Sequence, residues 1–319
     1  MQPYLRMCMI YMMLMIAGLI VSTGAGCSST PNPLKQIPPS LVNVSPAQNY
    51  NNKIAIVLSQ WPSTTIGQQI GKHYVETLIQ TIKNESTHLI LIDQKSADFP
   101  DYFLKMDQVV GSAQRLMAVS KTARLAGYQG WVDVRVAGLR PETKPSGFFW
   151  FRKVRHFIFF DLDLTVYDTI TGAKIMDSVI ESSAKVSEAE YNAFCSDAGQ
   201  GEKTLKTAIA EVASDQGEKI VEILQKQLWR IPVVQIDSGR IFLSVGSAAG
   251  LRIGDRLTVF EGRRTLPGQD GMSFLLPGFK IAQIEIVHVT SQKAEAKDLA
   301  SSKNTKIQVG DFAAAAVFK

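Results

Sequence analysis

The sequence lacks a concentration of charge of either sign. It carries 34 Lys and Arg against 29 Asp and Glu in 319 residues, a formal net charge of +5, and the basic residues are scattered along the chain. Nucleic-acid-binding proteins usually gather their basic residues on one face. The composition therefore argues against nucleic acid as a partner. It fits an ordinary globular chain, with 45% hydrophobic residues.

Motifs of catalysis and metal binding are also missing. No H-E-x-x-H, C-x-x-C or G-x-S-x-G occurs, and the four histidines fall in separate predicted elements. Asp161 and Asp163 form a D-x-D pair, but alternation from Phe160 to Tyr167 explains both as the solvent side of a half-buried strand. We expect no enzyme activity, no cofactor and no metal site. A hydrolase remains the weakest functional alternative, because a lone cysteine such as Cys195 is usually structural or inert.

Phosphate-binding patterns fail as well, although three glycines (Gly246, Gly250 and Gly254) follow an apolar strand at four-residue steps. A Walker loop needs Lys and then Ser or Thr after its second glycine, and a dinucleotide loop must open a helix. Here Leu251 and Arg252 follow Gly250, and a β-type segment, "RLTVF", comes next. The pattern predicts a positive φ at Gly250 and a tight turn at Gly254-Asp255.

Cysteine is scarce, and its placement concerns export. Residues 7–21, "MCMIYMMLMIAGLIV", form an apolar run as long as a signal-peptide core and short for a membrane-spanning helix. Small residues, "GAG", then precede Cys27. Removal of a signal peptide over residues 1–26 takes Cys8 with it, so we expect no internal disulfide in the mature chain. An uncleaved anchor is the alternative.

The junction at Cys27 resembles the lipobox of bacterial lipoproteins. The resemblance implies that Cys27 carries acyl chains such as palmitate and becomes the new N-terminus, which would hold the chain on a membrane. Gly24 stands where the family prefers a branched apolar residue, and ordinary cleavage beside Gly26 stays open as the alternative. Ser28 is not the aspartate that retains such proteins at the inner membrane, so the resemblance implies the periplasmic face of the outer membrane.

The rest of the chain divides into a tether and two predicted domains. Residues 27–52 are rich in Pro, Ser and Asn and predict a flexible tether. Residues 53–230 alternate strand-like runs with helix-period stripes, which predicts an α+β domain. Residues 231–319 contain six short strand-like runs separated by glycine-containing turns, which predicts a small all-β barrel or sandwich. The six runs are "VVQID", "RIFLSV", "RLTVFE", "KIAQIEIVHVT", "KAEAKDL" and "FAAAAVF".

One segment of the α+β domain combines exposed-type aromatic residues with basic ones. Phe148, Phe149, Trp150 and Phe151 stand directly before Arg152, and "PSG" ahead of them indicates a loop tip. Exposed aromatics beside Arg and Lys are typical of a partner interface or a membrane surface. The alternative is that these rings cap the core of the sheet. The loop between "WVDVRVAGL" and "VRHFIFF", which contains these residues, is predicted to be too short and too proline-rich for a full membrane-crossing hairpin. This argues against a channel.

Both domains resemble known families. The segments "KTARLAGYQGWVDVRV" and "DLDLTVYDTITGAKIMDS" resemble the domain shared by TolB-type N-terminal domains and the curli-secretion lipoprotein, a mixed α/β sandwich of the anticodon-binding-like kind. The segments "GRIFLSVGSAAGLRIGDRLTVFEG" and "IQVGDFA" resemble the C-terminal domain of the flagellar assembly protein T.

These resemblances imply a non-catalytic structural or assembly component of an envelope machine, above all the outer ring of the flagellar basal body. They imply envelope or basal-body proteins as partners, with a homo-oligomeric ring as one arrangement. The alternatives are a curli-type secretion channel subunit, another envelope-assembly lipoprotein and a periplasmic hydrolase.

Overall fold

A five-stranded mixed sheet forms the first half of the folded chain. The computed structural model describes residues 50–104, 113–198, 203–268, 273–276, 278–299 and 307–315. The strand order is β2-β1-β3-β4-β5. β1 (Asn52–Gln60) runs parallel to both β2 (Leu89–Asp93) and β3 (Tyr128–Ser146), whereas β4 (Lys153–Asp168) and β5 (Lys174–Val186) continue the sheet antiparallel.

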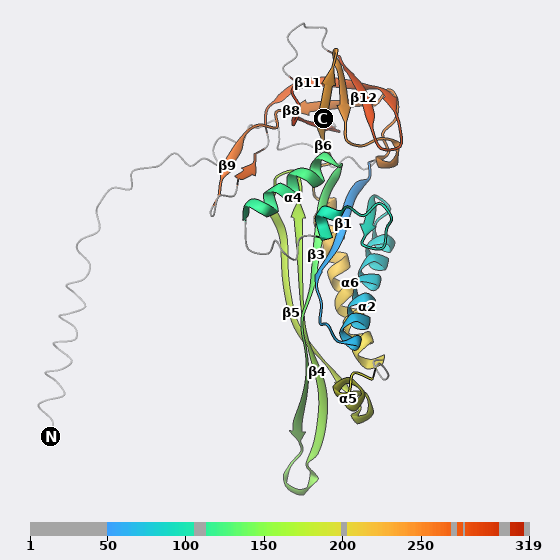
Figure 1. Cartoon of the computed structure of the whole chain (residues 1–319), viewed down its shortest axis with the longest axis vertical. Helices are drawn as coiled ribbons and strands as arrows, with labels where there is room; N and C mark the ends of the chain where they lie inside the picture. Colours follow the sequence, from blue (N-terminus) through green and yellow to red (C-terminus); the bar gives the residue numbers. More distant parts are fainter. Residues whose placement is uncertain are drawn as a thin grey trace, which may run out of the picture. The chain divides into compact units, whose positions relative to one another are not determined.

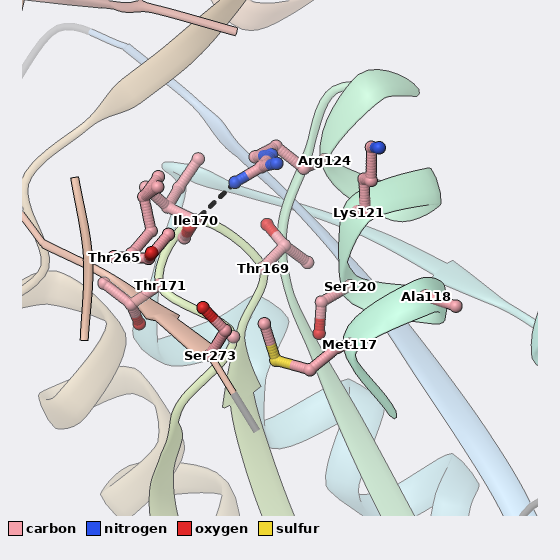
Figure 2. Close-up of a pocket in the computed structure, with 12 residues that line it drawn as sticks. Met117, Ala118, Ser120, Lys121, Arg124, Thr169, Ile170, Thr171, Thr265 and Ser273 are labelled. Atoms are coloured by element: carbon pink, nitrogen blue, oxygen red, sulfur yellow. Dashed lines mark hydrogen bonds between the residues drawn. The ribbon is translucent and has the colours of Figure 1, made fainter. Parts of the chain in front are cut away.

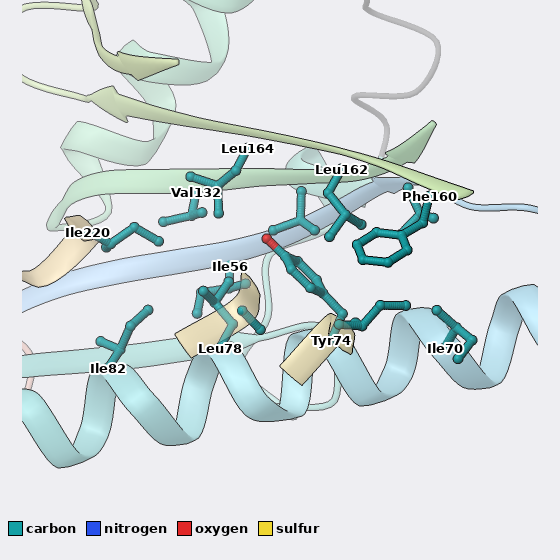
Figure 3. Close-up of a cluster of buried hydrophobic side chains, with 14 of the residues drawn as sticks. Ile56, Ile70, Tyr74, Leu78, Ile82, Val132, Phe160, Leu162, Leu164 and Ile220 are labelled. Atoms are coloured by element: carbon teal, nitrogen blue, oxygen red, sulfur yellow. The ribbon is translucent and has the colours of Figure 1, made fainter. Parts of the chain in front are cut away.

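Two long helices, α2 (Thr65–Glu85) and α6 (Lys203–Gln225), cover one face of this sheet, and the short helix α5 (Glu188–Cys195) precedes α6. The helical stripe of α2 places Ile70, Tyr74 and Leu78 against the strands, where all three are fully buried (Figure 3). The Tyr74 hydroxyl donates a hydrogen bond to the side-chain carbonyl of Gln216, which is fully buried on α6. The main core therefore lies between this helical layer and the sheet.

Among the described residues, α3 (Asp101–Leu104) and α4 (Ala113–Leu125) cover the other face of the sheet, at one end. There Trp131 stacks on Tyr167 with ring centroids 4.5 Å apart, and Phe103 packs against both Tyr128 and Trp131. Farther along the strands the same face is polar and partly exposed, and it carries Asp161 and Asp163. The sequence predicted that residues 160–167 alternate between a packed and a solvent-facing side, and this is confirmed for most of the segment. Thr165 and Tyr167 are exceptions, because both are buried at the end of the sheet that α4 covers.

The second half of the chain closes into a six-stranded barrel in the order β11-β12-β7-β6-β13-β8. Its strands are β6 (Arg230–Asp237), β7 (Arg240–Leu243), β8 (Arg256–Phe260), β11 (Lys280–Val289), β12 (Ala294–Asp298) and β13 (Phe312–Ala314). They are the six runs that the sequence predicted. The prediction of a mixed α/β sheet domain followed by a small β-barrel is therefore confirmed. The short hairpin of β9 (Thr265–Pro267) and β10 (Ser273–Leu275) was not predicted.

The glycines of the barrel adopt the predicted turn conformations. Gly250 has φ 90° and Gly254 φ 91°, a region that residues with a side chain rarely enter. The Asp255 carboxylate accepts a hydrogen bond from the Arg252 N–H at 2.8 Å. Asp311, in the second Gly-Asp pair, likewise accepts one from the Gln308 N–H at 2.7 Å. The same local turn therefore precedes β8 and β13.

The first described residues contact the barrel. The Tyr50 ring stacks on Trp229 with centroids 4.3 Å apart, and the Asn51 N–H donates to the Ala249 carbonyl at 2.9 Å. Asn52 is already the first residue of β1. The last three residues of the segment predicted as a tether thus belong to the folded structure.

Candidate interaction surface

The aromatic segment forms the turn of a long hairpin between β3 and β4. The ladder between these strands continues to the pair Ser146 and Lys153, whereas β5 pairs with β4 only as far as His156. Residues 144–155, which we call the hairpin tip, therefore extend beyond the end of β5 as a two-stranded hairpin. Figure 1 shows this hairpin running past α5 to its turn.

The structure corrects the prediction of a short proline-rich loop at this place. Pro141 pairs with Ile158 and Pro145 with Val154, so both prolines lie inside β3. β1 pairs with β3 only up to Arg135, and beyond that point β3 is an edge strand. An edge strand tolerates proline where the missing N–H would face away from its partner. This segment is therefore part of two paired strands, and its length gives no reason to exclude a channel.

The turn itself has an unusual backbone. Gly147 has φ 108°, and a Cβ at this position would lie 2.2 Å from the Phe151 carbonyl oxygen. Phe149 has φ 53°, a left-handed conformation that is uncommon for a bulky residue. A single 3₁₀ turn over Phe149–Phe151 follows, closed by the Phe151 N–H donating to the Phe148 carbonyl at 3.1 Å. This backbone directs consecutive aromatic rings outward.

The aromatic side chains of the hairpin tip are almost fully exposed. The exposed fractions are 80% for Phe148, 65% for Phe149, 85% for Trp150 and 79% for Phe151. The rings contact mainly each other, with centroids 5.2 Å apart for Phe148 and Phe149 and 5.4 Å for Phe149 and Trp150. The alternative interpretation, in which they cap the core of the sheet, is therefore wrong. That they bind a partner stays a prediction.

The charge around these rings has one sign. Arg152, Lys153 and Arg155 are exposed, and no Asp or Glu occurs from residue 143 to residue 160. Lys144, on the opposite strand, lies 4.5 Å from the centroid of the Phe159 ring and 3.6 Å from Glu142. The hairpin tip is thus an aromatic end with a basic collar, which suits an anionic and partly apolar partner.

A cavity of about 330 Å³ forms a second candidate site, which the sequence analysis missed (Figure 2). It lies between α4, the turn that joins β4 to β5, and the β9–β10 hairpin. Arg124 Nη1 donates to the Ile170 carbonyl at 3.1 Å, and burial lowers the pKa of Arg124 despite the nearby Asp168. The Ser120 Oγ is buried without a partner in the described part of the chain. These residues come from three distant segments, so no local motif could have indicated the cavity.

The remaining candidates of the sequence lie apart from both sites. Asp161 faces Arg140 at 3.5 Å, and within the described ranges no three His, Cys, Asp or Glu side chains are placed to hold a metal ion. Cys195 is a free, exposed thiol at the end of α5. Cys27 and the predicted signal peptide lie outside the described residues. In the portion that the structure describes, no helix combines the length and the apolar character that crossing a membrane requires.

Comparison with known proteins shows similarity of structure only. No protein-family model matches the chain, and no curated protein matches it. A minor lipoprotein from Acinetobacter baumannii is similar at 11% identity, over 54% of this chain and 93% of that one, with a TM-score of 0.29. The PelC dodecamer from Paraburkholderia phytofirmans is similar at 12% identity, over 58% and 95%, with a TM-score of 0.29. The lipoprotein GNA1162 from Neisseria meningitidis is similar at 10% identity, over 46% and 93%, with a TM-score of 0.25. The chain thus has distant structural similarity to bacterial envelope lipoproteins, and no specific family is identified.

Proposed function

We propose that this chain is a non-catalytic lipoprotein of the bacterial envelope, anchored through Cys27 to the periplasmic face of the outer membrane. It acts there as a structural or assembly component and contacts another part of the envelope through the hairpin tip. The observation that carries the proposal is the exposure of four consecutive aromatic rings on a hairpin that extends from a well-packed sheet. Large exposed apolar patches usually mark interaction sites, because leaving them in water is unfavourable.

Hydrogen bonds to two buried carboxylates, those of Asp168 and Asp311, support the proposal that the chain is not catalytic. Asp168 accepts hydrogen bonds from the backbone of Ile170 and Thr171, inside the turn between β4 and β5. The buried Asp311 accepts them from the backbone of Gly262 and Gln308. A carboxylate whose oxygens hold backbone amides in place has a structural role in the fold.

The outer ring of the flagellar basal body is the envelope machine that we propose to test first. The support is the resemblance of the barrel segments to the flagellar family, together with the turn geometry of the residues that carry it. Gly250, Gly254 and Gly310 all have positive φ, a backbone conformation that favours glycine in turns.

Fractionation of the envelope tests the function. We expect the chain to sediment with outer membranes and with purified basal bodies, and its deletion to impair motility. A Cys27→Ser variant should lose labelled fatty acid and leave the membrane fraction. Normal acylation of that variant would overturn the anchor, whereas intact motility without the chain and its absence from basal bodies would overturn the flagellar role.

A further inference from the structure

We propose that the hairpin tip is a membrane wedge, whose aromatic rings enter the interface of a bilayer that carries anionic phospholipids. This inference rests on the proposed function, since it names what the exposed tip contacts once Cys27 has placed the chain at a membrane. It adds a second, non-covalent attachment, made by side chains of the folded part.

The aromatic end matches the chemistry of the bilayer interface. Trp gathers at the level of the lipid headgroups, because its ring is apolar and its N–H is polar. Phe and Trp also form the buried face of segments that lie in the bilayer interface. Phe148, Phe149, Trp150 and Phe151 present four adjacent rings, each at least 65% exposed. Val154, the next apolar residue along β4, is 62% exposed and extends the apolar surface.

The basic collar lies at the depth where headgroups would meet it. Lys153 pairs with Ser146 in the first ladder row behind the turn, and Arg155 pairs with Lys144 two rows farther back. At about 3.4 Å per residue along a strand, these cations lie roughly 3–10 Å behind the turn. Interfacial segments bury their apolar side about 5–10 Å deep, so the rings would enter while the cations stay among the phosphates.

The charge pattern favours lipid headgroups as the source of negative charge. With no carboxylate from residue 143 to residue 160, nothing on the tip repels an anionic surface. The rings of the tip project into solvent, where Phe148, Trp150 and Phe151 are each at least 79% exposed. A bilayer accepts such projecting rings without a preformed pocket.

The turn is prepared for this contact before any membrane is present. The left-handed backbone of Phe149 and the tight approach of Gly147 to Phe151 hold the rings outward at a cost in backbone strain.

The sequence between Cys27 and the fold has enough residues to let the acylated cysteine and the hairpin tip reach the same membrane. Residues 28–49 can span up to about 75 Å, whereas the sixteen residues of β4 span about 54 Å.

Quenching of Trp150 by brominated lipid tests the wedge. The acylated full-length chain is bound to vesicles of phosphatidylethanolamine and phosphatidylglycerol with bromine in the acyl chains. The emission of Trp150 is obtained by subtracting that of a Trp150→Phe variant, which retains the three other tryptophans. We expect at least twofold quenching of Trp150 and less than 10% quenching of the variant.

Three further arms separate the outcomes. A chain with Arg152, Lys153 and Arg155 all changed to Ser should show at least threefold less quenching, whereas the exposed Val179→Ser control should behave like the wild type. Replacing phosphatidylglycerol by neutral lipid should also reduce quenching. A chain that binds vesicles through its acyl groups while Trp150 remains unquenched would overturn the wedge and leave the anchor intact. A chain that does not bind vesicles at all would overturn both the anchor and the wedge. Quenching of Trp150 in a Cys27→Ser chain would support the wedge without the anchor.

Discussion

Single carboxylate side chains cap the N-termini of helices in this chain. The carboxylate of Asp197 accepts hydrogen bonds from the N–H groups of Thr65 and Ile66 at 3.0 and 2.9 Å, and so caps α2 from 131 residues away. Glu190 accepts the N–H of Ser187, which completes a capping box, and also the N–H of Thr204 at the start of α6. A capping box is predictable from a sequence, because its two residues stand three positions apart. The Asp197 cap is not predictable in this way, because its partners are remote in sequence.

Glu190 should make the free energy of unfolding fall as the solution becomes acidic. Burial would raise its pKa, but hydrogen bonds from Ser187 and Thr204 outweigh that effect and lower the pKa from 4.5 to about 2. A lowered pKa means that the stabilisation is present above pH 4.5 and is lost as the pH falls toward 2. Glu190→Gln should therefore cost about 1 kcal/mol of unfolding free energy at pH 7, the usual value of a helix cap.

Urea denaturation of both proteins between pH 7 and pH 2 measures this difference. The gap between Glu190→Gln and the wild type should narrow below pH 4.5 and be small near pH 2. A gap that stays constant over that range would show that the charge of Glu190 has no part in the cap.

Two glycines of the barrel should differ in their tolerance of alanine. At Gly254 a Cβ would meet nothing within 4 Å, so only the positive φ opposes the change, at about 1–2 kcal/mol. At Gly246 a Cβ would lie 2.0 Å from the Thr290 carbonyl oxygen, and the cost should reach about 3 kcal/mol, because packed backbone must move. Urea unfolding of Gly254→Ala and Gly246→Ala ranks the two; the reverse order would contradict the turn geometry.

At the scale of elements, the helices α2 and α6 could be predicted from the sequence, whereas the hairpin of β3 and β4 could not. The helices were predictable, because Ile70, Tyr74 and Leu78 recur at helical spacing and face one core. The six barrel strands were predictable for a similar reason, since turn glycines separate short apolar runs. The continuous hairpin was not predictable, because Pro141 and Pro145 normally argue against a strand. Both prolines are tolerated here because β1 pairs with β3 only up to Arg135, so that β3 is an edge strand where they lie.

The buried contact between α2 and α6 offers a test of the helical layer. Tyr74→Phe would leave the side-chain carbonyl of Gln216 without this donor in a fully buried position, which should cost about 1–3 kcal/mol. The double variant Tyr74→Phe with Gln216→Leu removes both polar partners and should cost less than the sum of the two single variants. Unfolding free energies from urea titration complete the cycle, and strict additivity would contradict a direct contact.

At the scale of the whole molecule, the hairpin tip and the predicted anchor at Cys27 combine into one account. A lipid-anchored chain would hold its folded part at the membrane, and the tip would make a second contact there. Basic and aromatic residues in one run indicated the tip in the sequence, whereas the cavity beside α4 had no such signal because Arg124, Ile170 and Ser273 meet only in the fold.

The account's central claim is that the hairpin tip is occupied in the living envelope, and cysteine labelling measures that directly. In a Cys195→Ser background, cells carrying Trp150→Cys or the exposed control Lys226→Cys are treated with a water-soluble maleimide that reaches the periplasm. The account predicts that position 150 reacts at least tenfold more slowly than position 226 in cells, and at a similar rate in the purified, detergent-solubilised chain. Equal labelling of the two positions in cells would contradict it.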